Sequence, residues 1–169
     1  VVPDPVDPWD EELPARLAAR KRLGIDGSHP VLLYFGEMRE EKGVPLLLEA
    51  LSQYDGDSFT MVLAGSPTAV SISELESVEN ELVEMDIRAE FIPQEDVPVY
   101  FAAANAVVFP YRRSFGTARP SGVFQKACAA GRPVIAPNFG MFARRVEQFS
   151  LGRTFCPEDP DSLAETISQ

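Results

Sequence analysis

The sequence predicts an α/β fold: a Rossmann-like, doubly wound and mostly parallel sheet of about six strands with helices on both faces. Short apolar runs alternate with helical patterns along the whole chain. These runs are apolar throughout rather than alternating, which is typical of parallel strands covered on both faces. Right-handed crossovers between such strands place helices on both faces of one sheet. The 169 residues, 45% of them hydrophobic, suffice for one buried core, so one folded domain is expected.

The N-terminal third predicts a linker, a helix and a first strand–loop–helix unit. Three prolines among the first eight residues favour an extended segment. Residues 1–10 are therefore expected to be a linker from an N-terminal domain, and residues 11–169 the Rossmann-like domain. Apolar residues at helical spacing predict a helix over 11–23. A fully apolar strand over 31–35 and a helix over 44–51 follow.

The rest of the chain continues the alternation. Strands are expected at the remaining apolar runs, over 59–64, 87–92, 106–109, 133–136 and 153–156. Helices are expected between and after them, over 72–85, 98–105, 122–130, 141–148 and from 160 onward. The Ser73-x-x-Glu76 pattern predicts a capping box for the acidic helix over 72–85. Asp159 followed by Pro160 predicts the start of the last helix.

The composition disfavours several classes of partner. A formal charge of −11, from 26 acidic and 15 basic residues, would repel nucleic acid and an anionic membrane surface. No apolar run is long enough to predict a membrane span, and the first residues do not resemble a targeting signal. Cys128 and Cys156 have no CxxC spacing and no neighbouring histidine, so reduced thiols, no metal site and a cytoplasmic location are expected.

The loop after the first strand is one candidate for a binding site. Ligands of a doubly wound sheet bind beyond the carboxyl ends of its strands, and this loop begins there. Gly36 and Gly43 permit close backbone approach, and Lys42 offers a point charge to an anion. An ordinary charged surface turn is the alternative interpretation.

The loop after the strand over 106–109 is the second candidate. Arg112, Arg113 and Arg119 gather three cations in a chain that is acidic elsewhere. Ser121 and Gly122 then open a helix, whose free N–H groups favour a phosphate-bearing ligand. Ser121 also has a purely structural explanation as the helix cap.

Several catalytic patterns are absent from the sequence. It contains no GxGxxG, GxxxxGK[ST] or GxSxG motif. His29, the only histidine, stands before the first strand and is interpreted as a turn residue, which disfavours a histidine-based mechanism. The acidic pairs Glu40–Glu41 and Glu95–Asp96 are interpreted as surface features.

Five segments together resemble a known family. They occur in the family's order, over 2–7, 34–50, 91–110, 127–136 and 156–164. The resemblance is to the C-terminal domain of GT-B glycosyltransferases of the group 1, retaining family 4 type. It covers nearly the whole chain.

The resemblance implies the donor-binding half of a hexosyltransferase. The family binds a nucleotide-diphosphate sugar in this lobe and an acceptor in an N-terminal domain, with no required metal or other cofactor. It implies phosphate contacts for the loop and helix-start residues, namely Gly36, Lys42, Gly43, Arg119, Ser121 and Gly122. It implies nucleotide contacts for Ile92 and Pro93. Catalysis belongs to the cleft between the two lobes, so no catalytic residue is assigned and the isolated lobe is expected to be inactive.

The sequence departs from the family pattern at its acidic and basic positions. Glu37 stands where the family has an arginine. Two family glutamates align with Ala118 and Lys126, and a third acid aligns with Arg144. These departures leave open a degenerate lobe that acts as a binding or assembly module. A receiver-like signalling domain is disfavoured, because no paired aspartates follow the first strand.

Overall fold

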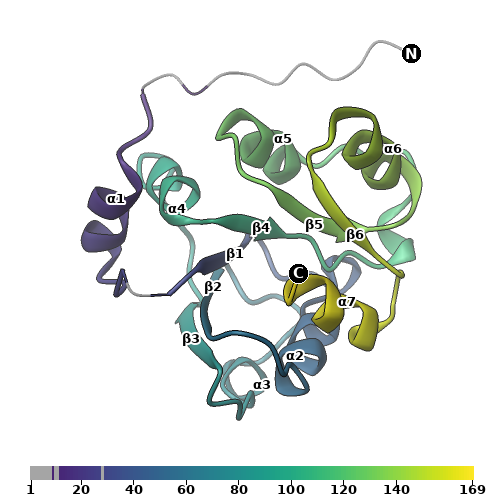
Figure 1. Cartoon of the computed structure of the whole chain (residues 1–169), viewed down its shortest axis with the longest axis horizontal. Helices are drawn as coiled ribbons and strands as arrows, with labels where there is room; N and C mark the ends of the chain where they lie inside the picture. Colours follow the sequence, from purple (N-terminus) through teal and green to yellow (C-terminus); the bar gives the residue numbers. More distant parts are fainter. Residues whose placement is uncertain (1–8, 10–11, 28) are drawn as a thin grey trace.

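The chain folds around one six-stranded, entirely parallel sheet. The computed structural model describes residues 9, 12–27 and 29–169. Within them the strand order is β3-β2-β1-β4-β5-β6 (Figure 1). The strands are β1 (Val31–Phe35), β2 (Phe59–Ala64), β3 (Val83–Arg88), β4 (Ala106–Val108), β5 (Val134–Pro137) and β6 (Gly152–Phe155). The predicted doubly wound, parallel architecture is confirmed.

Helices cover both faces of the sheet. They are α1 (Arg16–Leu23), α2 (Val44–Ser52), α3 (Ile72–Leu75), α4 (Val97–Ala103), α5 (Gly122–Ala129), α6 (Gly140–Phe149) and α7 (Pro160–Ile167). Two single-turn 3₁₀ helices, η1 (Glu40–Lys42) and η2 (Arg113–Phe115), lie in the loops after β1 and β4. Figure 1 shows α4, α5 and α6 on one side of the sheet and α2, α3 and α7 on the other.

Successive strand residues alternate between the two cores. Leu33 faces the core shared with α4, α5 and α6, whereas Leu32 and Tyr34 face the core shared with α2 and α7. This alternation explains why the strands are apolar throughout, since each face of the sheet needs its own apolar side chains. The first core is rich in aromatic rings, and Phe109 and Phe142 stack 6.1 Å apart near its centre.

The prediction for residues 72–92 is wrong. The helix expected over 72–85 ends after one turn, at Leu75, and the chain then turns into β3. Asn80 holds this turn, because its side-chain amide donates to the carbonyls of Leu51 and Tyr54, both at 2.8 Å. The strand expected over 87–92 therefore begins at Val83 and ends at Arg88.

The predicted capping box is also displaced. It forms between Ser71 and Glu74 rather than between Ser73 and Glu76. The Ser71 hydroxyl accepts from the Glu74 N–H at 3.2 Å, and the Glu74 carboxylate accepts from the Ser71 N–H at 2.7 Å. The box caps α3 where the chain leaves the loop after β2.

The remaining elements lie close to their predicted positions. Their first and last residues lie within two residues of the predicted ends, except for the start of α1. Helix α1 begins at Arg16, because the preceding Ala15 has non-helical backbone angles. Apart from Trp9, the linker expected over 1–10 lies outside the described residues. The Trp9 ring packs on the domain with its centroid 5.5 Å from that of Phe101.

Candidate functional site

The two candidate loops meet at the carboxyl ends of β1 and β4. These strands are neighbours in the sheet, and the chain order reverses between them, so a crevice for a ligand opens at this point. A cavity of about 270 Å³ lies here. Its lining comes from both loops and from the first turns of α5, namely Arg39, Lys42, Phe115, Arg119, Pro120, Ser121, Gly122, Val123 and Lys126.

Two glycines give the first loop its path. Gly36 and Gly43 have φ angles of 110° and 68°, which L side chains rarely adopt. A Cβ atom on Gly43 would lie 1.9 Å from the carbonyl oxygen of Pro110, so only glycine permits this approach to the second loop. The Arg112 N–H donates to the Glu41 carbonyl at 2.9 Å and ties the loops together. This contact brings η1 beside the start of α5.

Lys42 is buried at the centre of the cavity wall. Its side chain is 7% exposed, and its Nζ lies 5.9 Å from the centroid of the Tyr111 ring. Burial, with the nearby Arg39 charge, lowers the pKa of Lys42. Among the described residues no carboxylate lies within ion-pair distance of Lys42. Glu37 and Glu41 lie close enough to oppose this lowering in part, but neither forms an ion pair with Lys42. A buried cation without a direct ion pair is costly, and a bound anion would relieve that cost.

The N-terminus of α5 faces the same cavity. The Ser121 hydroxyl accepts from the Phe124 N–H at 3.3 Å and lies 3.4 Å from the Tyr111 hydroxyl. The N–H groups of the first helical turn have no partner within a helix. A Cβ atom on Gly122 would meet no atom within 4 Å, so the backbone there is open to a ligand. Ser121 thus caps the helix, as its structural explanation predicts.

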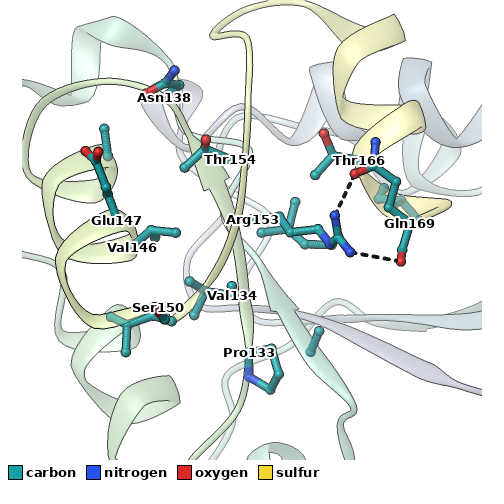
Figure 2. A pocket seen from close by; sticks show the side chains of 16 residues that line it. Pro133, Val134, Asn138, Val146, Glu147, Ser150, Arg153, Thr154, Thr166 and Gln169 are labelled. Atoms are coloured by element: carbon teal, nitrogen blue, oxygen red, sulfur yellow. Dashed lines mark hydrogen bonds between the residues drawn. The ribbon is translucent and has the colours of Figure 1, made fainter.

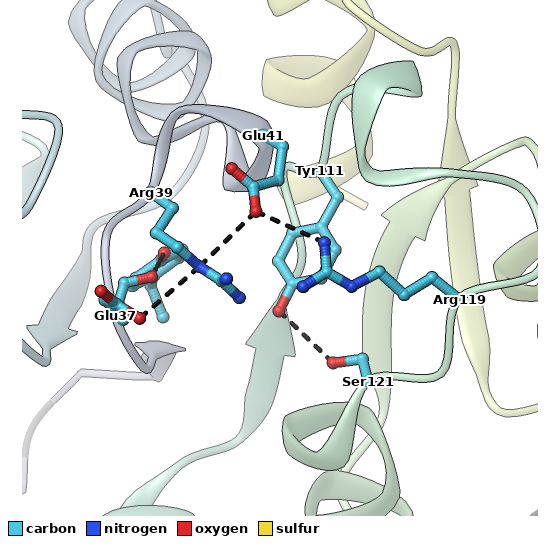
Figure 3. Close-up of polar contacts among 7 residues, drawn as sticks. Glu37, Arg39, Glu41, Tyr111, Arg119 and Ser121 are labelled. Carbon is cyan, nitrogen blue, oxygen red and sulfur yellow. Dashed lines mark hydrogen bonds and ion pairs between the residues drawn. The ribbon is translucent and has the colours of Figure 1, made fainter.

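Acidic side chains link the cations around the cavity (Figure 3). Glu41 Oε1 lies 3.5 Å from both Arg39 Nε and Arg119 Nη1. Arg39 Nε also lies 3.5 Å from Glu37 Oε2. A hydrogen bond from its own backbone N–H, together with the two arginines, lowers the pKa of Glu41. The interpretation of the pair Glu40–Glu41 as surface features holds for Glu40, whose side chain is 83% exposed. It does not hold for Glu41, whose side chain is 23% exposed and forms ion pairs in both loops.

The cavity gathers most of the predicted phosphate-site residues. Lys42, Arg119, Ser121 and Gly122 line it, whereas Gly36 and Gly43 shape the first loop without lining the cavity. Whether these residues bind phosphate stays a prediction.

Two of the predicted arginines point elsewhere. Arg112 lies 3.6 Å from both Glu40 and Glu158, outside the cavity. Arg113 lies over the Phe139 ring, 5.9 Å from its centroid.

Arg39 is the site residue that the sequence analysis missed. It lines the cavity although Glu37, not an arginine, stands at the expected position. The available signal in the sequence was a basic residue two positions after Glu37 in the same loop. Lys126 also lines the cavity, with its Nζ 5.0 Å from the centroid of the Trp9 ring.

Ile92 lies in a neighbouring cavity of about 460 Å³. Its lining is mostly apolar and comes from the ends of β1 and β2 and from the loop after β3, namely Phe35, Gly36, Glu37, Gly65, Ser66, Thr68, Phe91 and Ile92. Gly36 lies next to the Nζ atom of Lys42, which lines the cationic cavity. Gly36 itself lines the cavity that contains Ile92. Pro93 follows in the same loop but does not line the cavity. Of the two predicted nucleotide residues, Ile92 thus lines a cavity that shares Gly36 with the first candidate loop.

A larger cavity of about 900 Å³ lies at the β6 edge of the sheet (Figure 2). It runs between α6 and α7, away from both candidate loops. Among the described residues that line it, the one cation is Arg153, which already donates to the side-chain and backbone oxygens of Gln169 at 2.7 and 3.3 Å. This cavity offers no free positive charge to an anion.

The other chemically reactive side chains form no second site in the described part of the chain. Cys128 and Cys156 are unpaired, and burial raises the pKa of Cys128. Across residues 9, 12–27 and 29–169, no group of three potential ligands surrounds a metal position. No helix in these ranges is long and apolar enough to cross a membrane.

Known proteins match both the sequence and the fold. A family model described as glycosyl transferases group 1 matches residues 29–169. A D-inositol 3-phosphate glycosyltransferase of Geodermatophilus obscurus is 31% identical over 99% of this chain and 39% of its own length. The chain spans 34 to 39% of the length of the first curated relatives.

Solved glycosyltransferase structures share the fold. Sucrose-phosphate synthase from Thermosynechococcus elongatus superposes with a TM-score of 0.64 at 26% identity, over 92% of this chain and 39% of that one. Anabaena Alr3699/HepE in complex with UDP superposes with a TM-score of 0.64 at 24% identity, over 89% and 41%. The chain therefore belongs to the group 1 glycosyl transferases, and it corresponds to the C-terminal part of their GT-B enzymes.

Proposed function

We propose that this chain binds the nucleotide-diphosphate sugar donor of a hexosyltransferase. The observation that carries the proposal is Lys42, a buried cation without an ion pair among the described residues. It lines the same cavity as Arg39, Arg119 and the first residues of α5. A diphosphate would neutralise this cluster and accept from the helix N–H groups.

The same cluster would assist sugar transfer. Negative charge grows on the diphosphate as its bond to the sugar breaks, and fixed cations stabilise that charge without rearranging. Four side-chain cations line the cavity, so we propose that the donor binds without a metal cofactor. The family resemblance and the UDP complex of HepE support a nucleotide ligand.

We place the nucleoside in the cavity beside Ile92. This cavity adjoins the cationic one at Gly36, so a nucleoside there and a diphosphate at Lys42 would be continuous. Phe91 lines it with 78% of its surface exposed and offers an apolar ring to a base. Pro93 would contact the nucleotide from the same loop.

The acceptor and the completed active site are assigned to an N-terminal domain of the same protein. The chain spans less than two fifths of its curated relatives, which leaves room for that domain. We therefore propose that this lobe alone binds the donor without transferring sugar. The unpaired cysteines favour a cytoplasmic protein.

A non-catalytic binding or assembly module is the second candidate. It is favoured by the lining of the cationic cavity, which contains no carboxylate among the described residues and carries Lys126. Sugar transfer by the whole protein, measured with radiolabelled donors, would exclude this candidate.

Titration by heteronuclear NMR tests donor binding. UDP, ADP and GDP are added to the labelled chain up to millimolar concentration. Amide shifts are expected at 36–43 and 119–123, with no shifts around Arg153 in the β6 cavity. Absence of shifts in both loops with all three nucleotides would overturn the proposal.

A further inference from the structure

One carboxylate oxygen bridges two of the cations that line the cationic cavity. Glu41 Oε1 lies 3.5 Å from Arg39 Nε, which belongs to its own loop, and 3.5 Å from Arg119 Nη1, which belongs to the loop before α5 (Figure 3). Both arginines line the cavity. The carboxylate therefore stands where a phosphate oxygen would meet the same two guanidinium groups.

These contacts are long for charge-assisted hydrogen bonds, and the side chains that make them are partly exposed. Charge-assisted N–H···O bonds have lengths of about 2.7–2.9 Å. At 3.5 Å the Glu41 carboxylate forms ion pairs but no hydrogen bond with Arg39, and Arg39 Nε is buried without a hydrogen-bond partner among the described residues. The two guanidinium groups are thus held in place by ion pairs, but the Arg39 Nε–H still lacks a hydrogen-bond acceptor among the described residues.

We infer that Glu41 is an internal competitor for the donor's diphosphate, and this inference rests on the proposed function. Without ligand, its carboxylate holds Arg39 and Arg119 on opposite sides of the cavity. With ligand, the diphosphate takes both arginines, and the Glu41 side chain turns to solvent.

Exchange of this kind favours a diphosphate over weaker anions. A diphosphate carries more charge than one carboxylate and also reaches Lys42, which Glu41 does not pair with. The Glu41 carboxylate is partly exposed, so water can solvate it after release. Competition by Glu41 lowers the affinity of the site for every anion. Only a ligand that also contacts Lys42 offsets this reduction in affinity.

Glu40 provides a matched control next to Glu41. It carries the same charge in the same 3₁₀ turn, but its carboxylate is 83% exposed and lies 3.6 Å from Arg112, outside the cavity. Removing either carboxylate changes the net charge by the same amount. Only Glu41→Gln removes the bridge.

Calorimetric titration with UDP tests the inference. Glu41→Gln is expected to lower the Kd for UDP about fivefold, because the two partly exposed ion pairs of Glu41 no longer compete with the diphosphate. Glu40→Gln is expected to change this Kd less than twofold. Glu41→Asp keeps the charge but is too short to reach both arginines, and it is expected to lower the Kd by a smaller factor. In the unliganded Glu41→Gln protein, the side-chain N–H resonances of Arg39 and Arg119 are expected to move, while those of Arg112 stay.

The outcomes separate this inference from the proposed function. If the unaltered chain binds UDP, ADP or GDP but Glu41→Gln leaves the affinity for that nucleotide unchanged or weaker, the competitor role is wrong and donor binding stands. If Glu40→Gln tightens binding as much, the effect is net charge alone and the inference also fails. If none of the three nucleotides binds, both proposals fail.

Discussion

A Cβ atom on Gly65 would lie 2.2 Å from the carbonyl oxygen of Gly36. The loops after β1 and β2 therefore touch through their backbones, with φ angles of 110° at Gly36 and 139° at Gly65. Both glycines line the cavity assigned to the nucleoside. The close backbone approach sets the floor of that cavity, and no side chain larger than hydrogen fits at Gly65.

Gly65→Ala is expected to lower the free energy of unfolding by about 3 kcal/mol. The added methyl group meets rigid backbone, and alanine is strained at this φ angle. Urea unfolding followed by circular dichroism measures the loss. Gly131→Ala is the control, because its φ of 61° is strained but its Cβ meets nothing within 4 Å, so about 1 kcal/mol is expected. Equal losses in the two variants would show that the Gly36 contact adds no cost.

The sequence predicts the central strands closely but misplaces the edge strand β3, which is expected over 87–92 and runs from Val83 to Arg88. Strands β1 and β2 are apolar on both faces, so the pattern identified them directly. Strand β3 pairs only with β2 and alternates apolar with charged residues, and its first half falls within the helix expected over 72–85. The turn that starts it depends on Asn80 reaching carbonyls near the end of α2, a contact between distant segments that local pattern does not show.

The site was predicted by loop and residue type, but its internal pairing was not. The positions of Lys42 and Ser121 follow from where the strands end, which the sequence indicates. The approach of Arg39 to Glu41 depends on the one-turn helix η1, which turns both side chains toward the second loop. The charge pattern of the sequence does not distinguish the role of Glu41 from that of Glu40.

Lys42→Met is expected to weaken UDP binding at least tenfold without loss of stability. A contact between a cation and an anionic ligand contributes about 1.5–3 kcal/mol, and that contact is removed. The folded protein no longer buries an unpaired cation, so the free energy of unfolding should stay the same or rise. Calorimetry and urea unfolding measure the two effects. Arg112→Met is the binding control, since Arg112 lies outside the cavity and should leave the Kd for UDP unchanged.

Arg20→Ala is expected to cost about 2–4 kcal/mol of unfolding free energy. The buried guanidinium donates to the Ala103 carbonyl at 3.1 Å, to the His29 carbonyl at 3.1 Å and to the Asn105 side chain, joining α1 to the end of α4 and the start of β1. Its loss leaves buried acceptors unpaired. Arg20→Lys should rescue little, because an ammonium group lacks the planar fork that reaches these separate acceptors. Arg16→Ala, on the exposed face of α1, should change stability by less than about 0.5 kcal/mol.

The protein is expected to lose stability above about pH 10, where free tyrosines ionise. Burial raises the pKa of Tyr111 to about 12, and burial raises the pKa of Tyr34 as well. The unfolded chain releases these protons first, so the stabilisation is complete below about pH 10 and is lost as the pH rises toward 12 and beyond. Lys42 acts in the opposite direction, because its lowered pKa makes the unfolded chain hold the proton longer.

Urea unfolding at pH 8, 9.5 and 11 measures the change. The stability of Tyr111→Phe should fall less between pH 9.5 and 11 than that of the unaltered protein, and identical pH profiles would contradict the role of the Tyr111 phenol.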